Sequence, residues 1–99
     1  MSLPKAKVTE KWQITLPKET RLILHNLEPV YFQTLNGDVE LTSKLNGERG
    51  FLAKANLGLG WDICIPQIVR EHLGLSKGDT VEFDFKNYKI VMRKSKNRS

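Results

Sequence analysis

The sequence predicts a mainly β fold with two short helices, built from two tandem β-β-α-β-β repeats. Residues 10–21 read EKWQITLPKETR and residues 59–70 read LGWDICIPQIVR, so Trp12 aligns with Trp61, 49 positions later. Apolar positions stay matched beyond the helix if the offset becomes 51, which aligns Val30 with Val81. Within each copy the apolar period changes from strand-like alternation to helical spacing and back. A match of this extent indicates an internal duplication.

The first copy begins with two predicted strands and a helix. AKVT (residues 6–9) and QITLP (residues 13–17) alternate polar and apolar residues, as half-buried strands do. Pro17 cannot donate to a sheet ladder but suits the first turn of a helix. Glu19 follows in that turn, where the helix dipole favours a carboxylate. The predicted helix ends before Pro29.

The first copy ends with a hairpin, and the second copy repeats the whole order. VYFQT (residues 30–34) and VELTS (residues 39–43) alternate around Asn36 and Gly37, which favour a tight hairpin turn. The corresponding elements of the second copy are strand WDICIP (61–66), helix PQIVREHLG (66–74) and strands TVEFDF (80–85) and KIVMRK (89–94). Gly74 is placed to cap the second helix at its C-terminus.

The length suits one domain, because 99 residues is a common domain size. Each repeat alone, at roughly 45 residues, is near the size where a chain struggles to bury a stable core. We therefore expect both repeats to share one core, and neither half to fold alone. The predicted divisions are repeat one at 5–43, a linker at 44–50, repeat two at 51–93 and a basic tail at 94–99.

Composition and charge narrow the protein class. The hydrophobic fraction of 39% is low for a membrane protein, and no apolar run approaches the ~20 residues a span needs. A single cysteine, Cys64, cannot form an internal disulfide, and the start resembles no signal peptide, so we expect a cytoplasmic protein. The net charge is +5, and residues 93–99 (RKSKNRS) carry much of that excess. Such a tail either helps to hold a polyanion or only solubilises the chain.

No catalytic or metal-binding pattern is found in the sequence. His25 and His72 fall at the ends of the predicted helices, and Cys64 has no histidine near it in sequence. A metal site needs three or four ligands at recognisable spacing, and a phosphate cradle needs a glycine-rich loop before a helix. We therefore expect no enzyme activity, no cofactor and no bound metal.

The second copy carries the residues of a known pattern. ICIPQIVREHLGLSKGDTVEF (residues 63–83) resembles the AbrB/MazE/SpoVT family of DNA-binding domains, and residues 14–32 match in their first half but lack the Gly-Asp turn. The resemblance implies a swapped-hairpin β-barrel, in which two units exchange hairpins, commonly as a homodimer. Here residues 1–99 hold both units, so either one chain closes a single pseudo-symmetric barrel or the units pair with a second chain in a homodimer or higher oligomer.

The tryptophans depart from the family pattern. Trp12 and Trp61 stand where the family usually has a glycine between the first two strands. A large residue is costly at positive φ, so we expect this loop to follow a different path. The two rings either stack on nucleotides or pack the ends of the barrel.

The resemblance implies contact with duplex DNA through the first hairpin of each unit. Alternation should turn polar residues away from Val8, Ile14 and Leu16. The candidate DNA contacts are Lys5, Lys7, Thr9, Lys11 and Gln13 in the first copy, Lys54 and Asn56 in the second, and Arg21 and Arg70 in the helix motif. The alternatives are an ordinary solvated strand face for the hairpins, and structural bonds to a carboxylate or to carbonyls for Arg21 and Arg70.

These features together predict a DNA-binding protein, sequence-selective or general, and a cytoplasmic, nucleoid-associated transcriptional regulator of AbrB type. One alternative is the antitoxin of a toxin–antitoxin pair, although family antitoxins add an acidic or apolar tail and this tail is short and basic. The other alternative is a protein-interaction barrel that no longer binds DNA, because the second hairpin is nearly neutral. No membrane partner is expected.

Overall fold

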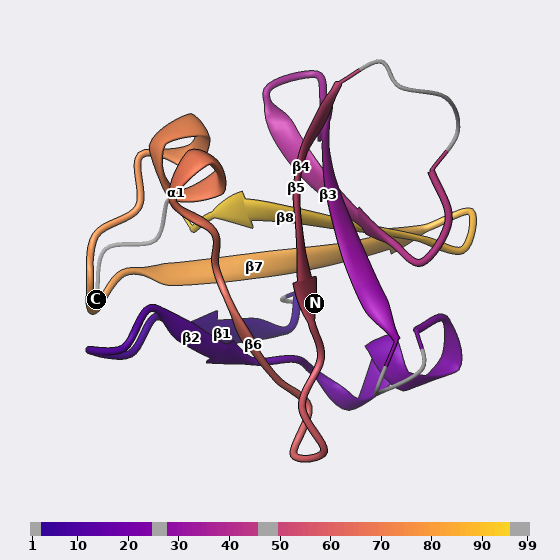
Figure 1. Cartoon of the computed structure of the whole chain (residues 1–99), viewed down its shortest axis with the longest axis horizontal. Helices are drawn as coiled ribbons and strands as arrows, with labels where there is room; N and C mark the ends of the chain where they lie inside the picture. Colours follow the sequence, from indigo (N-terminus) through magenta and orange to yellow (C-terminus); the bar gives the residue numbers. More distant parts are fainter. Residues whose placement is uncertain (1–2, 25–27, 46–49, 96–99) are drawn as a thin grey trace.

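Eight strands, one α-helix and one 3-10 helix form the part of the chain that this computed structural model describes, residues 3–24, 28–45 and 50–95. In chain order they are β1 Lys5–Lys7, β2 Gln13–Thr15, η1 Lys18–Leu22, β3 Pro29–Leu35, β4 Asp38–Thr42, β5 Phe51–Asn56, β6 Asp62–Cys64, α1 Gln67–Leu73, β7 Thr80–Lys86 and β8 Lys89–Lys94 (Figure 1). The predicted mainly β class and the order of its elements are confirmed.

The strands form two antiparallel sheets. Six strands pair in the order β1-β7-β8-β4-β3-β5, and β2 pairs separately with β6. The larger sheet therefore has β1 and β5 as its two edges, and its hydrogen bonds do not close a barrel. The short β1 and the separate β2–β6 ribbon leave these edges unjoined.

Most pairings join one copy of the repeat to the other. β1 pairs with β7, and β5 pairs with β3 at the corresponding register once the offsets of the two copies are applied. β2 pairs with β6, and Ile14 lies opposite Ile63, the equivalent residue of the other copy. β4 likewise pairs with β8, and Glu40 lies opposite Val91, its equivalent. Among the described strands, only the hairpins β3–β4 and β7–β8 pair within a copy.

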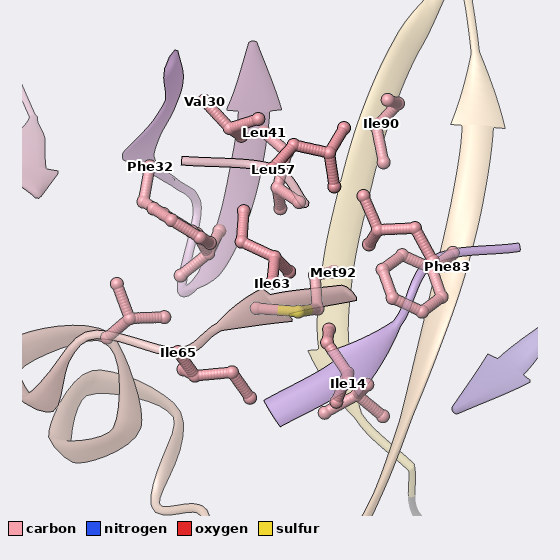
Figure 2. Close-up of a cluster of buried hydrophobic side chains, with 14 of the residues drawn as sticks. Ile14, Val30, Phe32, Leu41, Leu57, Ile63, Ile65, Phe83, Ile90 and Met92 are labelled. Atoms are coloured by element: carbon pink, nitrogen blue, oxygen red, sulfur yellow. The ribbon is translucent and has the colours of Figure 1, made fainter. Parts of the chain in front are cut away.

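One hydrophobic core lies between the two copies. Its side chains come largely from alternate strand positions, as the sequence predicts, and Figure 2 shows side chains of both copies packed in one cluster. Matched positions contribute together: Phe32 with Phe83, and Leu41 with Met92, each at most 1% exposed. Burying such a side chain contributes about 1.5–3 kcal/mol. The core is therefore complete only when both copies are present.

The two predicted helices differ in type. The second is the α-helix α1, and Gly74 caps it with a left-handed φ of 67°, as predicted. The first is a 3-10 helix, because the Ile23 N–H donates to the Thr20 carbonyl three residues earlier. The Thr20 hydroxyl also donates to the Pro17 carbonyl, at 2.6 Å, and such bonds compete with α-helical pairing. Among the described residues no helix is long and apolar enough to cross a bilayer.

The predicted linker and tail fall partly outside the described residues, which exclude 46–49 and 96–99. The start of the predicted tail is ordered, because Lys94 is the last residue of β8. Its ammonium group donates to the Gly74 carbonyl at 3.2 Å. The sheet therefore extends one residue into the segment assigned to the tail.

Candidate nucleic-acid interface

The loops between the first two strands of each copy are centred on the tryptophans. Trp12 has a φ of 59° and Trp61 a φ of 64°, both in the left-handed region. The prediction that a large residue would force a different path is therefore wrong. The tryptophans adopt the backbone conformation that glycine usually supplies, which costs roughly 1–2 kcal/mol for a residue with a Cβ.

Hydrogen bonds between the copies explain why that strain is tolerated. The Ile65 N–H donates to the Trp12 carbonyl at 2.8 Å, and the Leu16 N–H donates to the Trp61 carbonyl at 2.9 Å. Each tryptophan carbonyl is thus held by the other copy, immediately before that copy's proline. A strained backbone persists where the surroundings over-determine it, and these paired bonds do so here.

The two arginines of the helix motif stack on the tryptophans of the opposite copy. The Arg70 guanidinium lies 4.2 Å from the centre of the Trp12 ring, and that of Arg21 lies 5.1 Å from the centre of the Trp61 ring. Both indoles are half-buried and pack against the core. These contacts favour a packing role for the tryptophans. The arginines contact indole rings, where the sequence suggested a carboxylate or carbonyls.

We predict that Trp12→Gly destabilises the protein less than Trp12→Ala does, by about 1 kcal/mol, because both lose the indole but only alanine keeps a Cβ at positive φ. Urea unfolding measures the difference. Gln13, in β2, is the control: there alanine should be the more stable substitution, because glycine weakens a strand. A Trp12→Ala variant as stable as Trp12→Gly would mean that the loop does not keep its left-handed conformation.

The first hairpin presents its predicted polar face to solvent. Val8, Ile14 and Leu16 are buried, whereas the residues predicted to face outward are exposed: Lys5, Lys7, Thr9, Lys11 and Gln13. The ion pairs found among the described residues use other cations, namely Lys86, Arg93 and Lys94. The lysines of this hairpin are therefore open to an anionic partner.

Thr9 organises the loop as well as facing solvent. Its hydroxyl oxygen accepts hydrogen bonds from the backbone N–H groups of Lys11, at 3.3 Å, and Gln13, at 3.1 Å. Gly58 occupies the equivalent position of the second copy and has no side chain to do this. The first loop is thus more fully hydrogen-bonded by its own side chains than the second.

The second hairpin offers fewer cations. Lys54 and Asn56 are exposed on β5, at the opposite edge of the six-stranded sheet from β1. On the outer face of the β2–β6 ribbon the Thr15 hydroxyl donates to the Asp62 carboxylate at 3.0 Å. That carboxylate would repel a phosphate. The predicted contacts of the two hairpins are therefore not brought together into one symmetric face.

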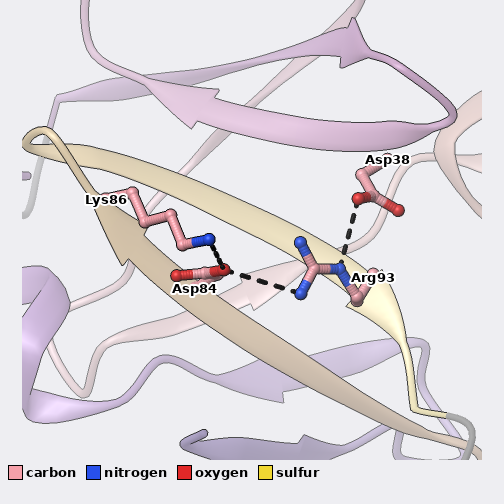
Figure 3. A network of polar contacts seen from close by, with 4 residues as sticks. All are labelled: Asp38, Asp84, Lys86 and Arg93. Carbon is pink, nitrogen blue, oxygen red and sulfur yellow. Dashed lines mark hydrogen bonds and ion pairs between the residues drawn. The ribbon is translucent and has the colours of Figure 1, made fainter.

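Part of the basic run at the C-terminus is already neutralised. Arg93 contacts Asp38 through Nε at 3.2 Å and Asp84 through Nη1 at 3.7 Å, and Lys86 also reaches Asp84 (Figure 3). Lys86 is exposed, whereas Arg93, Asp38 and Asp84 are half-buried. These ion pairs remove Arg93 from the cations available to a polyanion.

One cation of this region was not predicted from the sequence. Lys77, in the turn between α1 and β7, places its ammonium group 5.6 Å from the centre of the Trp12 ring. A turn between a helix and a strand gives no periodic signal, and only the fold brings it to the first hairpin. Groups of three or more His, Cys, Asp and Glu side chains suited to a metal are not found within the described ranges.

The chemistry of this surface is that of anion binding. Lysine ammonium groups neutralise phosphates, and the amide of Gln13 both donates and accepts hydrogen bonds. Comparisons of the chain with protein-family models, curated proteins and solved structures gave no match. The choice of function therefore depends on the residues of this chain and their arrangement.

Proposed function

We propose that the chain binds duplex DNA through its first hairpin, as a general or sequence-selective DNA-binding protein of AbrB type. The observation that carries this proposal is the set of exposed lysines on one hairpin, Lys5, Lys7 and Lys11, without carboxylate partners among the described residues. Phosphate neutralisation supplies most non-specific affinity for DNA. Gln13, exposed beside them, is able to bond to phosphates or base edges.

The strand pairing supports the architecture that goes with this function. We propose a swapped-hairpin unit that is completed within one chain, because β1 of the first copy pairs with β7 of the second and β5 pairs with β3. The exchange gives one molecule two first hairpins at corresponding positions, as a homodimer of the family would have, although their side chains differ. A role as a nucleoid-associated transcriptional regulator follows from the resemblance.

Fluorescence anisotropy of labelled duplex DNA tests this function. Binding should weaken as salt rises, with a log–log slope of about −0.9 for each phosphate contacted, so three lysines predict a slope near −3. Gel shifts on genomic fragments distinguish selective from general binding. Absence of binding at low salt, or binding that does not respond to salt, would contradict the proposal.

A second candidate function, self-association, is favoured by an apolar patch at the other end of the fold. Leu22 and Tyr88 are each 88% exposed, and they line a hollow together with Ile23 and Phe85. Tyr88 also has a φ of 60° in a hairpin turn whose equivalent residue is Gly37. A large, exposed side chain in a strained turn suggests a contact with another molecule. A two-fold axis through such a patch would pair it with itself in a homodimer.

We predict that Tyr88→Gly raises the free energy of unfolding by about 1 kcal/mol, because glycine relaxes a turn that requires positive φ. Combined with Leu22→Ser, it should also convert a dimer to a monomer in light scattering. Leu59→Ser is the control, because Leu59 is 73% exposed but outside the patch. A wild-type chain that stays monomeric over the whole concentration range would exclude self-association, and would leave a different protein, such as a toxin, as the partner to test.

A further inference from the structure

We infer that the strongest DNA contact is a composite corner, formed by Lys7 and Lys11 of the first hairpin together with Lys77 of the second copy. The inference rests on the proposed DNA binding and adds a residue that does not belong to the hairpin. The two copies then contribute unequally to one docking surface.

The turn that contains Lys77 is hydrogen-bonded to Val8, the residue that follows β1. The Val8 N–H donates to the Asp79 carbonyl at 2.8 Å, and the Gly78 N–H donates back to the Val8 carbonyl at 2.9 Å. Lys7 is paired with Thr80, the first residue of β7. The fold therefore holds Gly78, the residue after Lys77, against Val8, the residue after Lys7.

The Trp12 ring contacts the cations that surround it at this corner. Lys11 precedes it in the loop, Arg70 stacks on its ring at 4.2 Å, and Lys77 lies over the same ring at 5.6 Å. Arg70 is half-buried and lies closer to the ring than Lys77 does, so it is the more constrained of the two cations. Lys77 is exposed, and a cation–π contact at an exposed site contributes only about 0.5–1 kcal/mol. Its ammonium group is therefore held near the hairpin but is free to move onto a phosphate.

The nearby carboxylates are partly occupied. Asp79 accepts a hydrogen bond from the Ser76 N–H at 2.8 Å and pairs with Lys94 at 3.5 Å. Glu71 accepts a hydrogen bond from Gln67 at 3.2 Å but keeps its charge, and Glu10 is exposed in the loop itself. These two acids lower the affinity of the corner, and Lys77 offsets part of their effect.

The corresponding corner at Trp61 lacks these lysines. Asn56 stands in place of Lys7, Gly60 in place of Lys11 and Asn26 in place of Lys77, with Asn26 lying outside the described residues. Arg21 is the cation that stacks there. The Trp61 corner thus lacks the three lysines of the Trp12 corner, although Lys18 stands in place of Gln67 there, and DNA should dock at the Trp12 end.

Salt-dependent anisotropy titrations of Lys77→Gln test this composite corner. The variant should lower the magnitude of the salt slope by about one unit, as the loss of one phosphate contact does. Lys89→Gln, which removes an exposed lysine at the β7–β8 turn, should leave the slope unchanged. Urea unfolding of Lys89→Gln should match the wild type, and Lys77→Gln should lose no more than the roughly 0.5–1 kcal/mol of its exposed cation–π contact with Trp12.

Tryptophan fluorescence supplies a second readout of position. In Trp61→Phe the emission comes from Trp12 and should change when duplex DNA is added, and Lys77→Gln in that background should reduce the change. Trp12→Phe, which leaves Trp61, should respond less to DNA. If Lys77→Gln behaves like Lys89→Gln while changes at Lys7 and Lys11 weaken binding, the composite corner is wrong and the proposed function stands. If the wild type does not bind duplex DNA, both are overturned.

Discussion

Separated halves of the chain, residues 1–46 and 50–99, should each give the circular dichroism of an unfolded chain and show no cooperative melting as monomers. The reason is the strand pairing: of the four described strands in each half, only those of the β3–β4 or the β7–β8 hairpin keep their partner when the other half is absent. A two-stranded hairpin is marginally stable at best in water. The expected loss is therefore the whole fold.

The buried core also leads us to expect that neither half folds alone. Phe32 and Phe83 are both fully buried, and they belong to different halves. Cutting the chain exposes such side chains, each of which contributes about 1.5–3 kcal/mol when buried, against a typical total stability of only 5–15 kcal/mol. Neither half retains enough buried surface to offset the entropy of folding.

Light scattering must accompany the spectra, because an isolated half has one way to recover its partners. Two identical halves could exchange strands with each other and so fold as a dimer, which agrees with the pairing seen in the whole chain. Cooperative melting of a half that stays monomeric would contradict a shared core. Mixing the two halves should restore strand content, which serves as the positive control.

Elements whose cause is local could be predicted from the sequence. The Asn36-Gly37 turn and the Gly74 cap need only the conformational freedom of glycine and asparagine, and both occur as predicted. The 3-10 form of the first helix was not predicted, although the bond that accompanies it is also local, from the Thr20 hydroxyl to the Pro17 carbonyl. Alternation likewise identified the buried face of the hairpin without specifying its partner strand.

Features that depend on contact between the copies could not be predicted. The left-handed φ of Trp12 opposes its local preference, and the bond from Ile65 that supports it comes from residues far along the chain. Counting charges assigned Arg93 to a basic run, but Asp38 and Asp84 neutralise it in the fold. Lys77 was not predicted as a contact, because it is distant from the first hairpin in sequence and only the fold brings it close to Trp12.

The Lys7→Ala and Lys11→Ala double variant should weaken DNA binding on the order of tenfold, because an exposed ion pair contributes up to about 1 kcal/mol and two are lost. The magnitude of its salt slope should fall by about two units. Both side chains are exposed and form none of the ion pairs found among the described residues, so urea unfolding should be unchanged.

The equivalent change in the second copy should do less. Lys54→Ala removes the lysine of the weaker hairpin, where Asn56 stands in place of Lys7. Asp62→Asn should strengthen binding slightly, because it removes a carboxylate from the exposed face of the β2–β6 ribbon while leaving an oxygen to accept from Thr15. Anisotropy at several salt concentrations measures all three variants against one duplex. If Lys54→Ala weakens binding as much as the Lys7 and Lys11 pair, the hairpins are equivalent and the first has no special role. If none of the changes alters the affinity of a protein that binds DNA, Lys7 and Lys11 do not contact DNA, and the proposed role of the first hairpin is wrong.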